Sequence, residues 1–201
     1  MFDRHALALL RPAVTALGTV LARRGVRANH LTVAGLLLGL GSAVCIALQW
    51  FGVGAVLILL SRLCDALDGA VARQNQPTDA GAFLDIAFDF LFYASVPLGF
   101  AIAEPEQNAL PAAVLLAGFI GTGSSFLAFS ALAAKRNLQS TAYPDKSIYY
   151  LGGLTEATET IAVFLAMCVW PQHFAVLAYG FAALCALTTG MRIGWGWRAF
   201  Q

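Results

Sequence analysis

Charged residues are scarce in this sequence. Of its 201 residues, 11% are charged and 59% are hydrophobic, whereas charged residues make up about a quarter of an ordinary soluble domain. The composition therefore excludes a soluble globular protein and predicts an integral membrane protein. The 12 Lys and Arg residues nearly balance the 11 Asp and Glu residues, and the net charge of +1 gives no reason to expect a nucleic acid partner.

Linkers and paired cysteines are also missing. No stretch rich in serine, proline or charge divides the chain, so we expect residues 1–201 to form a single membrane domain. The cysteines lie in apolar segments without the paired spacing of a metal or disulfide site, and we interpret them as small core residues. They are Cys45, Cys64, Cys168 and Cys185.

What the chain does have is hydrophobic segments, six of them, each near the ~20 residues with which a helix crosses the hydrocarbon core. They are Leu31–Phe51, Val53–Arg73, Ala80–Ala103, Leu110–Ala134, Ile148–Trp170 and Phe174–Trp195. Lipid offers the backbone no hydrogen-bond partners, and no alternating pattern suggests a closed barrel. We therefore expect an all-α integral membrane protein whose six transmembrane helices form a bundle over residues 31–196.

Residues 1–28 do not fit this pattern. Their apolar run is too short to span a bilayer, and cations rather than a cleavage site follow it. Apolar residues nevertheless recur at helical spacing, which predicts an amphipathic juxtamembrane helix on the membrane surface. These residues are Leu7, Leu10, Val14, Leu17 and Leu21. A retained signal sequence is the alternative.

Lysine and arginine are absent from alternate connections. The connections "QWFGV", "AEPEQNA" and "WPQH" contain neither residue. Cations gather before the first segment, at the end of the second, after the fourth and around the end of the sixth. By the positive-inside rule, this distribution predicts that both termini are cytoplasmic.

Four aspartates interrupt the second and third segments. Asp65 and Asp68 share one face of the second helix, and Asp85 and Asp89 are four residues apart on the third. The loop between the two segments is short, so we expect antiparallel neighbours whose acidic faces meet near the cytoplasmic end. We interpret Asp79, in that loop, as an ordinary loop residue.

Such a cluster needs compensation, because a single acid at the bilayer centre costs about 2.5–3.5 kcal/mol. The nearest cations are Arg62 and Arg73. Carboxylate oxygens suit Mg²⁺ or Mn²⁺, and carboxylates from both helices can bridge two ions about 3.5–4 Å apart. Gly69 and Gly81, and less completely Ala72, leave room for a ligand near the backbone. Helix packing alone is the alternative explanation of the acids.

The stretch that starts at Asp65 and ends at Asp89 resembles the signature of the CDP-alcohol phosphatidyltransferases, D-x2-D-G-x2-A-R-x8-G-x3-D-x3-D. All eight specified positions are present: Asp65, Asp68, Gly69, Ala72, Arg73, Gly81, Asp85 and Asp89. In one departure, seven rather than eight residues separate Arg73 from Gly81, which shortens a loop and neither helix. Upstream, "ANHLT" is similar to the family's "PNxLT", with Ala28 in place of the proline.

The resemblance, which is to bacterial members, implies a transfer reaction in phospholipid biosynthesis. An acceptor alcohol attacks the lipid-side phosphorus of a CDP-linked lipid such as CDP-diacylglycerol, and CMP leaves. By position, the implied metal ligands are Asp65, Asp68 and Asp85, with Asp89 as a further ligand or the general base. Gly69, Ala72 and Gly81 would border the cytidine pocket, and Arg73 would contact the nucleotide phosphate. The family also implies a homodimer. We expect the protein in a bacterial inner membrane, and the cation distribution predicts an active site on the cytoplasmic side.

Residues further along the chain are candidates for the acceptor site. Glu156 and Glu159 share a face at the start of the fifth segment. They either bind the acceptor, pair with Arg62 or Arg192, or simply lie in the membrane interface. Lys135 and Arg136 lie at the same end and either hold an acceptor phosphate or only follow the positive-inside bias. The acceptor itself is not specified by the sequence.

A cation or proton transporter, or an ion-binding membrane protein, is the alternative function, because buried acids also build ion pathways. Internal repeats and interrupted helices near the midplane would be its signs, and the sequence has no convincing repeat. An intramembrane aspartyl protease fits poorly, because it needs two aspartates that share a proton. Clustered glycines predict close helix packing instead. They are Gly35 and Gly39 in the first segment and Gly118, Gly121 and Gly123 in the fourth.

Overall fold

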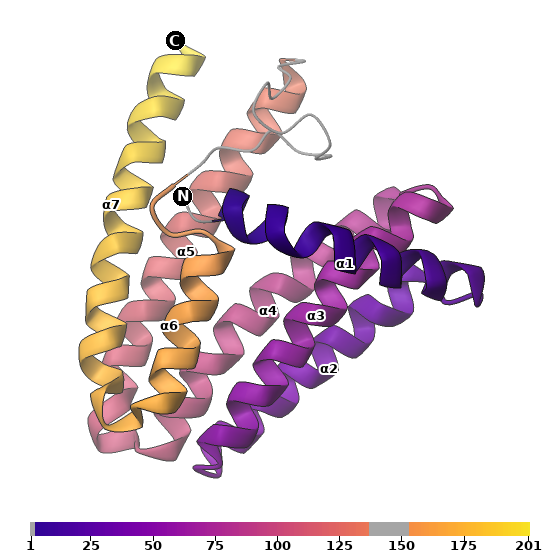
Figure 1. Cartoon of the computed structure of the whole chain (residues 1–201). Helices are drawn as coiled ribbons and strands as arrows, with labels where there is room; N and C mark the ends of the chain where they lie inside the picture. Colours follow the sequence, from indigo (N-terminus) through magenta and orange to yellow (C-terminus); the bar gives the residue numbers. More distant parts are fainter. Residues whose placement is uncertain (1–2, 137–152) are drawn as a thin grey trace.

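The computed structural model describes residues 3–136 and 153–201, which form helices with no strand among them. Figure 1 shows the chain as a bundle with one helix lying across it. The elements in chain order are α1 (Asp3–Arg23), α2 (Ala28–Ala47), α3 (Phe51–Asn75), α4 (Asp79–Ala103), α5 (Pro105–Lys135), α6 (Ala157–Val169), the 3-10 turn η1 (Pro171–His173) and α7 (Phe174–Phe200).

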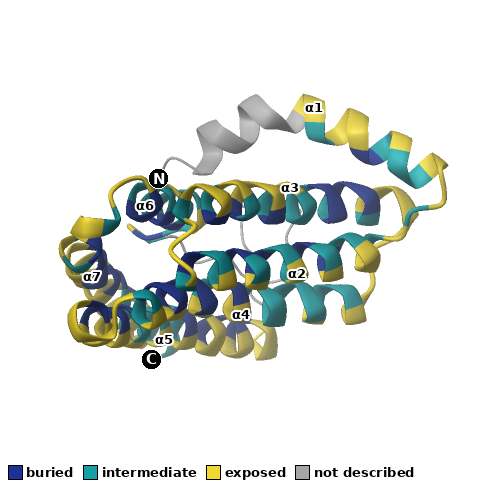
Figure 2. Cartoon of the chain, turned by 90° about the horizontal axis from the view of Figure 1, so that it is seen from below, coloured by how far each residue is buried: buried dark blue, intermediate teal, exposed yellow. Residues whose placement is uncertain are grey.

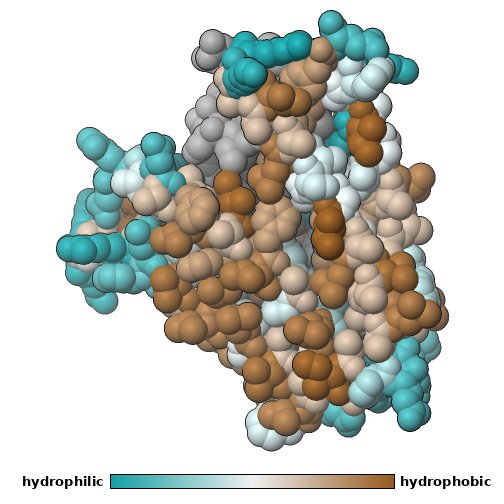
Figure 3. All heavy atoms as spheres, turned by 180° about the vertical axis from the view of Figure 1, so that it is seen from behind, coloured by the Kyte–Doolittle hydropathy of each residue, from teal (hydrophilic) through white to brown (hydrophobic). Residues whose placement is uncertain are grey.

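Four helical stretches are long and apolar enough to cross a membrane: Ala28–Ala47, Asp79–Ala103, Pro105–Lys135 and Pro171–Phe200. Helix α3 has 25 residues, but charges interrupt its second half. Helix α6 has 13 residues, and the predicted fifth segment begins at Ile148, outside the described residues. The all-α membrane fold is thus confirmed, while the number of six spans stays a prediction. On the face shown in Figure 3, hydrophobic residues form a broad continuous surface.

Two helices extend well beyond the predicted segments. Helix α5 begins at Pro105 rather than Leu110, because a proline fits the first turn of a helix, where its missing N–H is not needed. Helix α7 continues to Phe200, beyond the predicted end at Trp195. Both extensions carry polar or charged residues, so hydropathy alone does not reveal them.

Helix α2 packs against both α3 and α4, and small residues allow the close approach. A Cβ atom on Gly35 would lie 3.3 Å from the Cβ of Cys64, and one on Gly39 would lie 2.5 Å from the ring of Phe92. The predicted close packing at these glycines is confirmed. In the same way, a Cβ on Gly118 of α5 would lie 3.1 Å from Cys185 of α7. Helix α2 therefore holds α3 and α4 in one unit.

The hydrophobic core is rich in aromatic rings. Phe92, Phe100, Phe164 and Phe174 are fully buried. In Figure 2, dark blue marks the buried residues on the helices that carry these rings. The rings of Phe100 and Phe174 stack with centroids 4.6 Å apart, which ties α4 to the start of α7. Phe92 and Phe164 meet edge-on at 6.2 Å and join α4 to α6. These contacts fix the helices around the aspartates.

Helix α1 lies across the bundle and contacts α3 and α6 (Figures 1 and 2). Gly18 faces the bundle and is buried, whereas Leu17 and Val20 are 51% and 47% exposed. A helix that leaves apolar side chains on its outer side suits a membrane surface. The predicted surface helix is thus present as a separate element, and its place on the membrane stays a prediction.

Candidate active site

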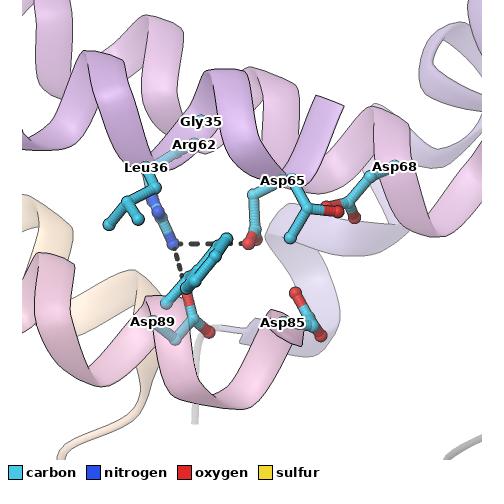
Figure 4. Close-up of a pocket in the computed structure, with 9 residues that line it drawn as sticks. Gly35, Leu36, Arg62, Asp65, Asp68, Asp85 and Asp89 are labelled. Carbon is cyan, nitrogen blue, oxygen red and sulfur yellow. Dashed lines mark hydrogen bonds and ion pairs between the residues drawn. The ribbon is translucent and has the colours of Figure 1, made fainter. Parts of the chain in front are cut away.

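The four aspartates of the sequence motif face one another across a gap between α3 and α4 (Figure 4). Asp65 and Asp68 come from α3, and Asp85 and Asp89 come from α4. One carboxylate oxygen from each of Asp65, Asp68 and Asp85 lies within 4.8 Å of the other two. The two predicted acidic faces therefore meet.

A short turn joins the two helices, and α2, which packs against both, sets the distance between them. Helix α3 ends at Asn75, Gln76 has a positive φ of 66°, and α4 begins at Asp79. Thr78 caps the new helix, because its Oγ1 accepts a hydrogen bond from the N–H of Gly81 at 3.1 Å. The cap fixes the start of α4 and so the positions of the two aspartates that follow.

Asp68 gives a direct indication of a missing partner. Its residue is 6% exposed, and its Oδ2 is buried without a hydrogen bond to any described residue. A buried carboxylate oxygen left in this state is unfavourable, and a divalent cation would satisfy it. The donor set consists of carboxylates alone, which suits Mg²⁺ or Mn²⁺. The residues present therefore fit a bound metal.

Asp89 lies in a different environment. Nη1 of Arg62 donates a hydrogen bond to its Oδ1 at 2.6 Å, and the same nitrogen is 3.5 Å from Oδ1 of Asp65. The guanidinium lies over the ring of Phe92, 4.0 Å from its centroid. The sequence identified Arg62 as a nearby cation but not this pairing, which joins two different helices.

A cavity of about 730 Å³ adjoins the carboxylates, a size typical of small-molecule sites. Seven of the eight signature residues line it, and Asp65 lies in a smaller pocket beside it. The seven are Asp68, Gly69, Ala72, Arg73, Gly81, Asp85 and Asp89. The predicted metal and nucleotide residues thus share one concave site, and their individual roles stay predictions.

Other walls of the cavity were not predicted. Tyr93, Phe119 and Phe126 supply aromatic surface. Arg192 also lines the cavity; it is 7% exposed, and its Nη1 donates to the carbonyl oxygen of Thr122 at 3.0 Å. From the sequence, Arg192 was only a possible partner for Glu156 or Glu159, because no motif surrounds it.

The acceptor-site candidates separate into different positions. Glu156 lines the cavity, whereas Glu159 is not among its described lining residues. Together they form a capping box at the start of α6, in which a carboxylate oxygen of Glu159 accepts from the N–H of Glu156 at 3.3 Å. Their acceptor role stays a prediction, and Glu156 is the better placed of the two.

The two cationic candidates lie elsewhere. Nη2 of Arg136 donates to the carbonyl oxygen of Phe200 at 2.8 Å, at the end of α7. Neither Lys135 nor Arg136 is among the described residues that line the cavity. This location favours a structural role for Arg136, and binding of an acceptor phosphate stays untested.

Residues 25–191 match the family model of the CDP-alcohol phosphatidyltransferases. The chain belongs to this family. It is 51% identical over 197 residues to the inner membrane protein YnjF of Escherichia coli (strain K12), covering 98% of this chain and 96% of the relative. It is 34% identical over 101 residues to an archaetidylinositol phosphate synthase of Pyrococcus horikoshii, covering 48% and 54% of the two chains.

The fold of a CDP-alcohol phosphatidyltransferase is also recognisable in three dimensions. The crystal structure of the Mycobacterium tuberculosis phosphatidylinositol phosphate synthase with CDP-DAG bound superimposes with a TM-score of 0.73 at 22% identity, covering 92% of this chain and 93% of that one. At this identity, the likeness shows a shared fold. Family membership makes the chain a transferase of phospholipid biosynthesis. The apolar helices and the Escherichia coli relative support a bacterial inner membrane protein.

Proposed function

We propose that this protein transfers the phosphatidyl group of a CDP-linked lipid, such as CDP-diacylglycerol, to the hydroxyl of an acceptor alcohol and releases CMP. The observation that carries the proposal is the convergence of Asp65, Asp68 and Asp85 beside a cavity lined by the remaining signature residues. A cluster kept for packing alone would not need an adjoining cavity of about 730 Å³.

The residues divide the work of phosphoryl transfer, which consists mainly of positioning and of neutralising charge. Asp65, Asp68 and Asp85 would hold Mg²⁺ or Mn²⁺. Two such ions, which carboxylates from two facing helices can bridge, would supply positive charge to the substrate diphosphate. Gly69, Ala72 and Gly81 border the space for the cytidine, and Arg73 would contact a phosphate of the nucleotide.

The bond changes are those of a substitution at phosphorus. The acceptor oxygen forms a bond to the lipid-side phosphorus, and the bond from that phosphorus to the CMP oxygen breaks. CMP leaves with the bonding electron pair. Asp89, which lines the cavity, would take the proton of the acceptor hydroxyl. The acyl chains remain in lipid while the nucleotide occupies the cavity.

We also propose a site that opens to the cytoplasm, a homodimer, and a contact between Glu156 and the acceptor. The cation distribution supports a site that opens to the cytoplasm with both termini on that side. The family resemblance supports a homodimer. For the acceptor, the position of Glu156 in the cavity wall supports contact with the alcohol, and the identity of the alcohol is the object of the experiment below.

The experiment uses the purified chain in lipid nanodiscs with CDP-diacylglycerol, Mg²⁺ or Mn²⁺, and a panel of acceptor alcohols. We expect CMP release and a new phospholipid with one acceptor class. Asp85→Asn should abolish turnover while the protein remains folded, and the matched control Asp79→Asn, an exposed acid at the start of α4, should not. Full turnover by Asp85→Asn would refute the ligand assignment.

A transporter is the second function to exclude. Cation or proton flux into proteoliposomes without any CDP-lipid, together with no CMP release from the wild type, would favour it. The four aspartates lie in the halves of α3 and α4 next to the turn that joins them, and three of them line the cavity, which supports the transferase.

A further inference from the structure

Arg62 lies outside the family signature, whose first specified position is Asp65. It is nevertheless placed at the carboxylate cluster, one turn before Asp65 on α3 (Figure 4). Its side chain is 16% exposed. A buried arginine on a membrane helix is expensive, so its position calls for an explanation beyond the signature.

The four aspartates are not equivalent around this arginine. Asp65, Asp68 and Asp85 bring carboxylate oxygens within 4.8 Å of one another, and Asp89 is not part of that group. Oδ1 of Asp89 instead accepts the 2.6 Å hydrogen bond from Arg62. Charge-assisted hydrogen bonds of this length are among the strong ones. Asp89 is therefore held by the Arg62 guanidinium and does not belong to the group that the other three carboxylates form.

Arg62 is itself fixed on several sides. Its Nη2 donates to Oγ of Ser61 at 3.1 Å, and that hydroxyl donates to the carbonyl oxygen of Gly35 at 2.7 Å. The ring of Phe92 supports the guanidinium face at 4.0 Å, a cation–π contact. Phe92 is fully buried. The arginine thus has one well-defined position, set by α2, α3 and α4 together.

One atom of Arg62 lacks a partner. Its Nε is buried and makes no hydrogen bond to any described residue. If the arginine served only to neutralise charge in the bundle, a position with every N–H satisfied would be more stable. The conformation instead directs Nη1 to Asp89, at the expense of Nε.

We propose that Arg62 is a positioning residue that reserves Asp89 for the acceptor proton. Its Nη1 holds Oδ1 of Asp89 and also lies 3.5 Å from Oδ1 of Asp65, which fixes the orientation of Asp89 so that its second oxygen can meet the acceptor hydroxyl in the cavity. Asp89 then takes the proton as the new oxygen–phosphorus bond forms. The inference rests on the proposed function and concerns Arg62, which orients the aspartate that the proposed function makes the base.

The first test compares two aspartates by a measurement that does not require turnover. Mn²⁺ binding to the nanodisc protein is followed by the electron paramagnetic resonance signal of free Mn²⁺. We expect Asp85→Asn to lose Mn²⁺ binding, because a ligand is removed. Asp89→Asn should retain most of it, because asparagine keeps an oxygen for Arg62. Both variants should fail to release CMP. An equal loss of Mn²⁺ binding in the two variants would overturn the inference.

The second test changes the arginine. Arg62→Gln should lower kcat for CMP release by about tenfold or more, with KM for the CDP-lipid changed by less than about threefold. Its Mn²⁺ affinity should stay the same or rise, because a nearby positive charge is gone. Arg62→Lys should recover part of kcat, because it restores the charge without the planar fork. Arg198→Gln, an exposed arginine near the end of α7, is the matched control and should behave as wild type.

The results separate this inference from the proposed function. A wild type that releases no CMP with any acceptor contradicts the proposed function. If the wild type releases CMP, two results for Arg62→Gln would contradict the role of Arg62 alone. One is a normal kcat, and the other is a loss of Mn²⁺ binding together with the loss of activity. An Arg62→Lys variant as inactive as Arg62→Gln contradicts it as well. If Arg62→Gln does not fold, Arg62→Lys is compared with the wild type in its place, and an unchanged kcat contradicts the role of Arg62.

Discussion

Gly18 of α1 lies directly against Ala70 of α3. A Cβ atom on Gly18 would lie 2.6 Å from the Cβ of Ala70, so no larger residue fits without displacing a helix. Ala70 is 3% exposed and lies between Gly69 and Ala72 of the signature. The surface helix therefore packs on the same turns of α3 that border the proposed nucleotide pocket.

Gly18→Val should separate α1 from α3. Overpacking of this kind costs about 1–3 kcal/mol, and we expect a lower Tm together with faster tryptic cleavage near Arg23 and Arg24. Gly180→Val is the matched control, because a Cβ on Gly180 meets nothing within 4 Å. Equal Tm and cleavage rates in the two variants would contradict the packing of α1 on α3.

Substrate binding should depend on divalent metal as strongly as turnover does. A CDP-lipid brings an anionic diphosphate to Asp65, Asp68 and Asp85, and like charges at short distance repel in a medium of low dielectric constant. Removing metal with EDTA should therefore abolish binding of CDP-diacylglycerol to the nanodisc protein, and Mg²⁺ or Mn²⁺ should restore it. The measurement is equilibrium binding of radiolabelled CDP-diacylglycerol, and metal-independent binding would contradict the prediction.

The two glutamates at the start of α6 should respond differently to substitution. Glu159→Ala removes the side chain that accepts from the N–H of Glu156, and loss of a cap costs about 0.5–2 kcal/mol. We expect a lower Tm with an unchanged KM for the acceptor, whereas Glu159→Gln should keep the capping box and the stability.

Glu156 lines the cavity, so its substitution should affect the reaction. Glu156→Gln keeps an oxygen for the cap and should leave Tm nearly unchanged. We expect it to raise KM for the acceptor once that alcohol is known, with KM for CDP-diacylglycerol unaffected. Steady-state kinetics with each substrate varied in turn provide the measurement. A variant with both KM values unchanged would remove Glu156 from the acceptor site.

The cap at Thr78 should support the two aspartates that follow it on α4. Thr78→Val has a similar shape but cannot accept the hydrogen bond from Gly81, and we expect it to destabilise the protein by about 1 kcal/mol. Thr78→Ser retains the hydroxyl and is the control. Thermal unfolding of both variants in one detergent measures the difference. Identical Tm values for the two variants would show that the cap does not contribute.

Local sequence patterns predicted the core of the site because they depend on helix geometry alone. The spacing of Asp85 and Asp89, and of Asp65 and Asp68, fixes the face on which each pair lies whatever the rest of the chain does. Likewise, small residues such as Gly35 and Gly39 indicate a close helix contact before the partner helix is known.

Contacts between distant helices were beyond such patterns. The pairing of Arg62 with Asp89 depends on how α2 spaces α3 and α4, and sequence periodicity contains no information on that distance. For the same reason, we did not predict that Arg192 lies in the cavity wall or that Arg136 contacts the end of α7. Hydropathy also underestimated α5 and α7, whose ends are polar.

The charges of α3 have a consequence for biogenesis. The second half of this helix carries Arg62, Asp65 and Asp68, and each would cost about 2.5–3.5 kcal/mol if the translocon released it alone into lipid. Helix α2 precedes it and packs against it, and only residues 76–78 separate it from α4, whose Asp89 pairs with Arg62. We therefore expect α3 to enter the membrane stably only when it packs with α2 and α4, which would bring the four aspartates together during insertion.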